Sequence, residues 1–212
     1  MRSIRSFAKA RSRLSANHRK ILNQENDFFF SANTKPAFEE TLRCTNNKIL
    51  EIGFGEGDSL FEMAVNNPDL NFFGIEVYET GVARTCSKIE ESGIKNLKIY
   101  LGDVVDLILD KDIETTFDLL LFLFPDPWHK RKHNKRRLIS ENFLMNIKKI
   151  MRENGTLRIK TDWQDYADEI EIYLKKVFKN YKEAADQKLD SITKYEKIAL
   201  AEKRKISYFE VY

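Results

Sequence analysis

The chain has 212 residues, a formal net charge of +3 and only two cysteines, Cys44 and Cys86. This length is enough for one domain with its own apolar core, so neither a disulfide nor a metal ion is needed for folding. No apolar run approaches the roughly 18–20 residues that cross a bilayer, which excludes a membrane protein. Two isolated cysteines outside any C-x-x-C pattern are typical of a reducing cytoplasm.

Positive charge is concentrated in two segments of the chain. Residues 1–24 contain seven Lys or Arg and no acid, and residues 128–137 contain six. Taking these thirteen cations from the net charge of +3 leaves −10 for the remainder. Such clustering indicates a site for a polyanion, most often nucleic acid. We expect residues 1–36 to form a basic, flexible arm that orders on RNA, although the same composition also fits an organellar transit peptide.

Beyond this arm, the sequence alternates between strand-like and helix-like segments. A short helix is predicted at residues 37–42. Strands are predicted at residues 48–54, 71–77, 97–101, 117–124, 156–161 and 206–212. Helices are predicted at residues 58–66, 78–92, 104–109, 137–151, 164–178 and 195–203. This alternation predicts one α/β domain over residues 37–212, with a mostly parallel sheet between two helical layers. The last strand alternates in polarity, which favours an antiparallel or edge position.

The first predicted strand ends in a glycine turn that contains an acid. Gly53, Gly55 and Gly57 fall as G-x-G-x-G, whereas a nicotinamide turn has the spacing G-x-G-x-x-G. Glu56 lies within the turn, where it would repel a pyrophosphate but not a ligand with a sulfonium and an amine. Glu51, just before the turn, is placed to face that amine.

Acids also end the next two strands. Glu76 can accept hydrogen bonds from ribose hydroxyls, and Asp103 can contact an adenine amino group or cap the following helix. Ligands of such sheets bind at the carboxyl ends of the strands. Three acids at neighbouring strand ends therefore favour S-adenosylmethionine as the cofactor.

The fourth long strand runs into Pro125-Asp126-Pro127-Trp128, followed by the second basic segment. The two prolines restrict the backbone on both sides of Asp126, which aims one carboxylate at the junction of cofactor and substrate. Trp128 is suited to stack on a base, and the basic run to bind phosphates. The alternative is an ordinary loop with a solvated run of charges.

Residues 125–137 resemble the signature of the bacterial tRNA (guanine-N7-)-methyltransferase family. Three further motifs are similar and occur in the same order as in that family. They are the glycine turn with the Gly74-Ile75-Glu76 strand end, Lys160-Thr161-Asp162, and Thr193-Lys194-Tyr195-Glu196. The resemblance extends over nearly the whole chain from Lys48 onward, and residues 2–7 look like an arm often seen in the family.

This resemblance implies a Rossmann-like class I S-adenosylmethionine-dependent methyltransferase that methylates N7 of a guanosine in tRNA, in the variable loop. The implied catalytic residue is Asp126. The implied cofactor-binding residues are Glu51, Gly53, Gly55, Gly57, Glu76, Asp103 and Asp126. The implied substrate-binding residues are Lys130, Asp162, Thr193, Lys194, Tyr195 and Glu196. One departure is visible: family members commonly have a glycine before the last strand, where this chain has Lys203-Arg204-Lys205.

The chemistry expected of such an enzyme is mainly positioning. Guanine N7 has an in-plane lone pair and no proton, so Asp126 and Asp162 are expected to favour the charge that develops as the methyl group arrives. For Asp162, a helix cap before residue 163 is an equal alternative. We expect a cytoplasmic monomer or homodimer that binds tRNA and no metal. The rivals are methylation of a protein or small molecule, an RNA-binding module with a decayed cofactor site, and a nicotinamide enzyme.

Overall fold

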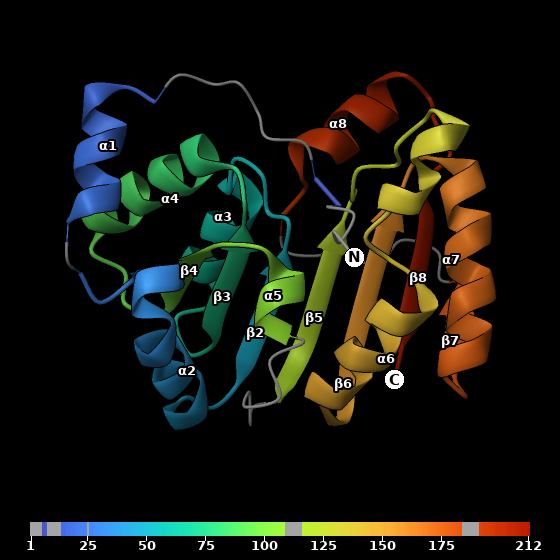
Figure 1. Cartoon of the computed structure of the whole chain (residues 1–212), viewed down its shortest axis with the longest axis horizontal. Coiled ribbons are helices and arrows are strands. Elements are labelled where there is room, and N and C mark those ends of the chain that lie inside the picture. Colours follow the sequence, from blue (N-terminus) through green and yellow to red (C-terminus); the bar gives the residue numbers. More distant parts are fainter. Residues whose placement is uncertain (1–5, 8–13, 25, 109–115, 184–190) are drawn as a thin grey trace.

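The computed structural model describes residues 6–7, 14–24, 26–108, 116–183 and 191–212, which form a mixed sheet between two layers of helices (Figure 1). The strands are β1 (Phe29–Ser31), β2 (Lys48–Ile52), β3 (Asn71–Glu76), β4 (Leu97–Leu101), β5 (Phe117–Leu123), β6 (Met151–Thr161), β7 (Tyr181–Glu183) and β8 (Ser207–Val211). Their order across the sheet is β1-β4-β3-β2-β5-β6-β8-β7. The six strands from β1 to β6 are parallel to one another, and β8 lies antiparallel to both β6 and β7.

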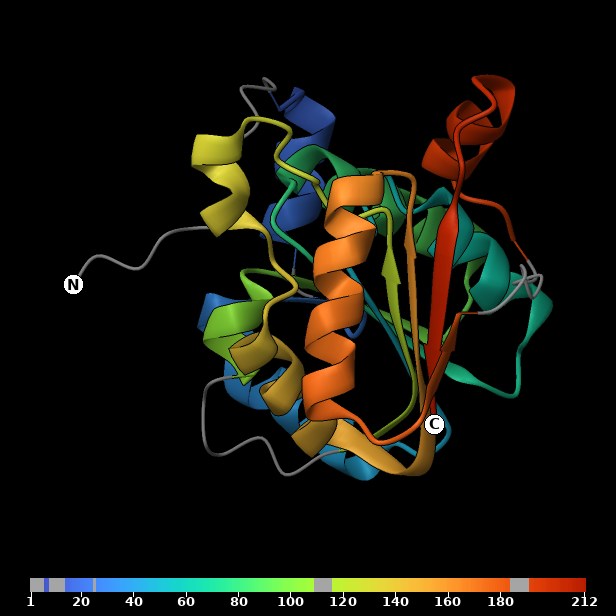
Figure 2. The same cartoon turned by 90° about the vertical axis from the view of Figure 1, so that its right-hand side faces the viewer.

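The helices cover the two faces of this sheet (Figure 2). They are α1 (Ala16–Asn23), α2 (Lys35–Cys44), α3 (Asp58–Asn66), α4 (Glu79–Ser92), α5 (Val104–Ile108), α6 (Glu141–Ile150), α7 (Gln164–Val177) and α8 (Lys194–Ala201). Two 3-10 helices, η1 (Ala32–Thr34) and η2 (Arg131–Arg136), lie between them. Helices α1, α3 and α4 pack on one face, and α2, α5, α6 and α7 pack on the other. No helix in the described part of the chain is long and apolar enough to cross a membrane.

Each face of the sheet has its own apolar core because successive strand residues point to opposite sides. In β5, Leu120 and Phe122 lie in the core beneath α6 and α7, whereas Leu121 and Leu123 lie in the core beneath α3 and α4. All four are buried. The continuous apolar run of this strand therefore fills both cores, as expected for a central parallel strand.

The predicted elements from residue 48 onward agree with the structure, apart from a few boundaries. Within the expected helix over 137–151, residues 137–140 are not helical and α6 begins only at Glu141, while the preceding residues 131–136 form η2. Strand β8 is antiparallel as predicted, but β7 pairs with its outer side, so it is not the edge.

The folded part of the chain begins before the expected boundary at residue 36. Helix α1 buries Ile21, and strand β1 buries Phe30 and pairs with β4. The described residues between 14 and 36 thus belong to the α/β domain, while residues 1–5 and 8–13 of the arm lie outside the described residues.

The topology reverses between β2 and β5, which are neighbours in the sheet but far apart in sequence. On one side of this point, the sheet continues from β2 through β3 and β4 to β1. On the other side, it continues from β5 through β6 and β8 to β7. In doubly wound sheets, ligands bind in the crevice outside the carboxyl ends of the two strands at such a switch point. Glu51 lies in β2, and Asp126 follows β5, so the fold places two of the predicted carboxylates beside this crevice.

Candidate active site

The glycine turn after β2 has a backbone that only glycine adopts at no cost. Gly53, Gly55 and Gly57 all have positive φ angles, of 76°, 62° and 73°. A Cβ at Gly57 would lie 2.0 Å from the Thr85 hydroxyl, so the turn packs tightly on α4 there. At Gly53 and Gly55, by contrast, a Cβ would meet nothing within 4 Å. The first two glycines therefore leave open space along the backbone, where a ligand can approach.

Two buried glutamates flank this turn. Glu76 is fixed by the backbone, because one carboxylate oxygen accepts from the Gly55 N–H at 2.8 Å and the other from the N–H groups of Val77 and Tyr78 at 2.6 and 2.9 Å. Glu51 is only 3% exposed, and its Oε2 is buried without a hydrogen-bond partner. Burial, with a smaller effect of the Glu76 carboxylate, raises the pKa of Glu51 to about 8. Burial also raises the pKa of Glu76, against the three backbone donors.

An unpartnered buried carboxylate oxygen costs free energy unless a ligand satisfies it. Repulsion between two buried acids is relieved in the same way by a cation. The arrangement of Glu51 and Glu76 beside an open glycine backbone therefore fits a cationic ligand that also carries hydroxyl groups.

Asp103 lies at the third strand end, directly before α5. Its Oδ1 accepts from the Val105 N–H at 2.9 Å, which is the helix-capping geometry expected as one alternative. Its side chain is partly exposed. The structure thus places Asp103 in line with Glu51 and Glu76 along β2, β3 and β4, and the adenine contact expected of it stays a prediction.

The Pro-Asp-Pro-Trp segment leaves β5 as a strained loop. Phe124 and Trp128 have φ angles of 54° and 48°, which side-chain-bearing residues adopt at a cost of about 1–3 kcal/mol each. Between them, Asp126 is exposed, and its Oδ1 accepts from the Trp128 N–H at 3.0 Å. Strain of this kind is retained where the surrounding structure enforces it, often at functional sites.

The indole of Trp128 is already in contact with its surroundings. The Arg136 guanidinium lies 4.9 Å from the ring centroid, and the ring of His133 makes an edge contact at 5.8 Å. The indole N–H donates to the backbone oxygen of Ser6 at 3.0 Å. This bond brings Ser6 to the loop, and Arg136 occupies one face on which a base was expected to stack.

The basic run after the loop is divided between surface and interior. Lys130 and the cations Arg131, Lys132 and Lys135 are exposed around η2. Arg137, which was predicted to belong to the same phosphate-binding surface, is 3% exposed in its side chain and pairs with Asp165 and Glu169 of α7. The prediction is wrong for Arg137, because a buried guanidinium held by two carboxylates cannot reach phosphate.

Asp162 follows β6 and is mostly buried. It forms an ion pair with Arg204, and the N-cap residue of α7 is Trp163, which has no side-chain cap. The Thr161 hydroxyl accepts from the Trp163 N–H instead, at 3.3 Å. Asp162 therefore does not cap the helix, and the alternative that gave it this role is wrong.

The motif over residues 193–196 begins α8. Thr193 is the N-cap, and its hydroxyl accepts from the Glu196 N–H at 3.1 Å. The Glu196 carboxylate pairs with Lys160 of β6 at 2.8 Å, with the two side chains 4% and 2% exposed. Its other oxygen, Oε2, is buried and has no hydrogen-bond partner. Lys194 and Tyr195 are exposed on the surface of α8.

Two contacts join these segments at the edge of the sheet that is formed by the carboxyl ends of the parallel strands. Lys194 of α8 pairs with Glu56 of the glycine turn at 3.1 Å, so the C-terminal motif reaches the cofactor-binding motif. The rings of His129 and Trp163 lie 4.4 Å apart, so the Pro-Asp-Pro-Trp loop contacts the start of α7. Figures 1 and 2 both show η2 and α8 beyond the carboxyl ends of the parallel strands. The predicted site residues thus gather along this edge.

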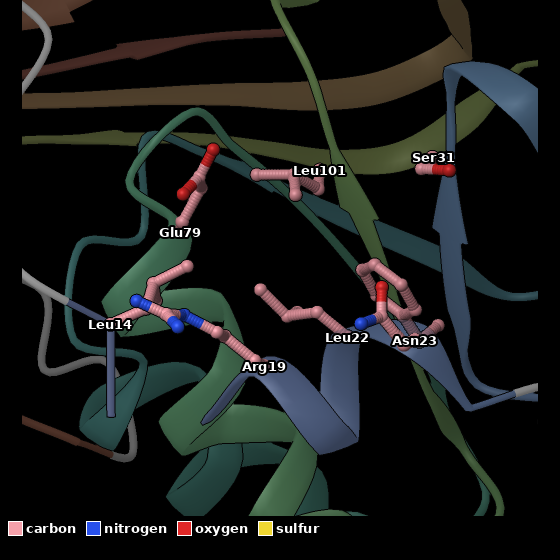
Figure 3. A pocket seen from close by; sticks show the side chains of 8 residues that line it. Leu14, Arg19, Leu22, Asn23, Ser31, Glu79 and Leu101 are labelled. Carbon is pink, nitrogen blue, oxygen red and sulfur yellow. The ribbon is translucent and has the colours of Figure 1, made fainter. Parts of the chain in front are cut away.

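A separate cavity of about 270 Å³ lies at the outer end of the same edge (Figure 3). It is bounded by α1 and β1 on one side and by the start of α4 and the end of β4 on the other. Its lining residues are Leu14, Arg19, Leu22, Asn23, Phe29, Ser31, Glu79 and Leu101. None of the predicted site residues lines it, but it continues the row of strand ends beyond Asp103.

Sequence reasoning missed several residues that hold the site together. The missed partner of Glu196 is Lys160, and that of the α7 acids is Arg137. The missed partner of Asp162 is Arg204. Lys203 explains the missing glycine before the last strand, since it adopts a φ of 55° at the end of α8. The unusual Lys203-Arg204-Lys205 run was a usable signal, because it replaces the expected turn residue and supplies the partner of Asp162.

Comparison with known proteins places the chain among methyltransferases. The family model Methyltransf_4, described as "Putative methyltransferase", matches residues 45–209. The solved structure of human methyltransferase-like protein 13 in complex with SAH is similar, with a TM-score of 0.54 and 14% identity over 93% of this chain and 82% of that one. This likeness shows the class I methyltransferase fold, as the sequence predicted.

Curated relatives identify the family more narrowly. The chain is 39% identical over 171 residues to the tRNA (guanine-N(7)-)-methyltransferase of Mannheimia succiniciproducens, over 80% of this chain and 69% of that protein. It is 38% identical over 176 residues to the protein of the same name from Colwellia psychrerythraea, over 79% of this chain and 70% of that protein. The chain therefore belongs to the tRNA (guanine-N(7)-)-methyltransferase family.

Proposed function

We propose that this protein transfers a methyl group from S-adenosylmethionine to N7 of a guanosine in tRNA. The relatives described above carry this activity in their names. The observation that carries the proposal in this structure is the buried, unpartnered carboxylate oxygen of Glu51, beside Glu76 and the open glycine turn. Glu51, Glu76 and the glycine turn, called the acidic site below, lie at the same edge of the sheet as the exposed cations of η2.

Three successive strand ends supply acids suited to S-adenosylmethionine. We assign Glu51 to the amino group, Glu76 to the ribose hydroxyls and Asp103 to the adenine amino group, because the three acids follow the order of β2, β3 and β4 in the sheet. Gly53, Gly55 and Gly57 form the turn that lets the cofactor approach the backbone. When bound, S-adenosylmethionine supplies an electrophilic methyl group on a cationic sulfur.

Asp126 is the proposed catalytic residue, and its chemistry is electrostatic. The carboxylate follows β5, beside the switch point, and faces solvent where a substrate can reach it. Guanine becomes cationic as N7 gains the methyl group, so a carboxylate at this position stabilises the transition state more than the ground state. No general base is required, because N7 carries no proton.

The substrate side of the site consists of Lys130, Asp162 and residues 193–196. Lys130 is exposed and suited to a phosphate, while Tyr195, also exposed, is suited to stack on a base. Asp126 and Asp162 supply carboxylate oxygens that can accept from the guanine N1–H and N2–H groups, a pair of donors that adenine lacks, and residues 193–196 help to hold the base. We further propose that the guanosine lies in the variable loop, as the family resemblance implies, and that its base leaves the stack, since N7 is hard to reach in a continuous stack.

The remaining proposals concern the setting of the protein. The structure shows both cysteines as free thiols, Cys44 exposed and Cys86 buried, which suits the reducing cytoplasm that we propose as its location. We propose a monomer or homodimer that needs no metal for the transfer. Among the described residues, no group of three or more His, Cys, Asp or Glu side chains is arranged to hold a metal ion.

The test is incubation of the protein with S-adenosylmethionine carrying a labelled methyl group, in separate reactions with unmodified tRNA and with a protein extract. We expect label in tRNA alone, and 7-methylguanosine as the product after digestion to nucleosides, at a single position when the tRNA is mapped. Label in protein, or in another nucleoside of tRNA, would overturn the proposal.

A further inference from the structure

Arg137 differs in its surroundings from the exposed cations of the segment over residues 128–137. Lys130, Arg131 and Lys132 are exposed, whereas the side chain of Arg137 is 3% exposed. Its N–H donors point into the protein rather than toward a bound polyanion. Because Arg137 points into the protein, its role differs from the phosphate binding that we propose for the exposed cations.

The partners of the Arg137 guanidinium come from two separate segments. On one side, it donates to Glu169 and to Asp165 of α7, each at 2.5 Å, and it lies 4.8 Å from the centroid of the Tyr166 ring. On the other side, its Nε–H donates to the backbone oxygen of Pro127 at 3.0 Å. The guanidinium therefore joins the Pro-Asp-Pro-Trp loop to a rigid helix of the domain.

The Pro127 carbonyl is a backbone group of the residue that follows Asp126. The loop is strained at both ends, at Phe124 and Trp128, so it requires an external restraint to keep its conformation. The bond from Trp128 N–H to Asp126 lies within the loop and cannot fix the loop relative to the sheet. The ring contact between His129 and Trp163 lies beyond the prolines. Arg137 thus provides a polar link between the loop and α7 within one residue of Asp126.

We propose that Arg137 is a positioning residue for methyl transfer: anchored on Asp165 and Glu169, it holds the Pro127 carbonyl and thereby fixes the Asp126 carboxylate, and it does not bind tRNA phosphate. The inference rests on the proposed function in one respect, the role of Asp126 in the reaction. The restraint of the loop by Arg137 is independent of that role.

The geometry of these three contacts requires an arginine at position 137. Its planar guanidinium donates in several fixed directions at once and reaches two carboxylates and a carbonyl together. A lysine at this position keeps the charge but has one nitrogen, so it cannot join the α7 acids to Pro127 in the same geometry. Arg137→Lys is therefore the diagnostic substitution. Arg131→Lys is the matched control, because it makes the same change at an exposed position of the run.

The experiment measures the loop and the reaction separately. Trp128 and Trp163 are the only tryptophans of the chain, so a Trp163→Phe background leaves Trp128 as the single fluorescent reporter. In that background, we expect Arg137→Lys to increase quenching of Trp128 by acrylamide, and Arg131→Lys to leave it unchanged. With tRNA, we expect Arg137→Lys to lower kcat about tenfold or more, with the Kd for tRNA and its salt dependence within about twofold of the parent.

Each outcome bears on the proposal. A raised Kd and a flatter salt dependence with unchanged kcat would show that Arg137 binds phosphate, and unchanged quenching would show that it does not hold the loop. If Arg137→Lys does not fold, Glu169→Gln removes one anchor only and is expected to change quenching and kcat in the same direction but less. If the parent protein does not methylate tRNA, the proposed function fails, whereas the quenching experiment still tests the restraint.

Discussion

The acidic site and the Pro-Asp-Pro-Trp loop lie at the same edge of the sheet, but they present their carboxylates in opposite ways. Glu51 and Glu76 are buried side chains of β2 and β3, and burial raises the pKa of both. Asp126 is an exposed side chain on a strained loop. In the acidic site, burial raises the pKa of the acids and so favours their protonated forms. In the loop, the backbone sets the position of the acid and leaves it open to solvent.

This difference suits the two partners of the proposed reaction. A small cationic cofactor is bound best by desolvated acids, because their interaction with its charge is strongest away from water. A folded RNA needs an accessible surface, and exposed cations beside Asp126 provide one. Substitutions in the acidic site should therefore change cofactor binding and its pH dependence, whereas substitutions in the loop should change turnover or RNA binding.

The largest effect is expected for Asp126→Ala. Loss of the carboxylate that faces the developing charge should lower kcat by about 10²–10⁴-fold, measured as 7-methylguanosine formed under saturating tRNA and cofactor. Because Asp126 is exposed, the free energy of unfolding should change by no more than about 0.5 kcal/mol. The matched control is Asp69→Ala, because Asp69 is an exposed acid at the opposite edge of the sheet, where the strands begin. Turnover of Asp126→Ala within about twofold of the parent would remove this residue from the mechanism.

Neutralising the exposed cations in and next to η2 should mainly weaken RNA binding. A variant with glutamine at Lys130, Arg131, Lys132 and Lys135 is expected to bind tRNA roughly tenfold or more weakly. The slope of log K against log salt should become shallower by about 0.7–0.9 for each phosphate that is no longer neutralised. The control carries glutamine at four exposed lysines that lie just before β4 or near the C-terminal ends of α6 and α7, namely Lys95, Lys148, Lys175 and Lys179. Equal weakening in the two variants would mean that the second basic segment is not a specific tRNA surface.

The attachment of α8 concerns stability rather than activity, and there a buried and an exposed ion pair can be compared directly. Glu196→Gln removes the charged partner of the buried Lys160, so we expect a loss of about 3–5 kcal/mol in the free energy of unfolding. Lys194→Ala breaks the exposed pair with Glu56, and we expect a loss below about 1 kcal/mol. Urea unfolding of both variants checks the order. The reverse order would show that α8 is held mainly by its contact with the glycine turn.

Much of the fold was predictable because its signals are local. The apolar runs of β2 and β5, and the helical spacing of α3 and α4, each lie within a short window of sequence. Strands β1 and β7 were missed because each has three residues and exists only through pairing with β4 or β8. Their sequences contain no pattern of their own, so nothing short of the fold identifies them.

The candidate site divides in the same manner. The acids Glu51, Glu76 and Asp103 were placed on one edge because parallel strands end together. The burial of Arg137 was not predictable, because it depends on acids 28 and 32 residues further along the chain, and a run of cations by itself indicates a solvated surface. The role of Thr193 as a helix cap was likewise hidden by the functional motif that contains it.

The pH dependence of cofactor binding offers the sharpest test of the acidic site, because Glu51 is a buried acid whose charged form is stabilised by a cation beside it. With a pKa of about 8, free Glu51 is mostly protonated at neutral pH, and an ammonium group bound beside it lowers that pKa. Binding therefore releases a proton below pH 8, and affinity falls as the pH is lowered.

The measurement is calorimetric titration with S-adenosylhomocysteine, which keeps the ammonium group, at about pH 6, 7 and 8. For the parent protein, we expect affinity to fall by a factor approaching about tenfold per pH unit below pH 8. For Glu51→Gln, we expect little pH dependence. An affinity that is independent of pH in the parent, or the same pH dependence in Glu51→Gln, would show that Glu51 does not bind the ammonium group.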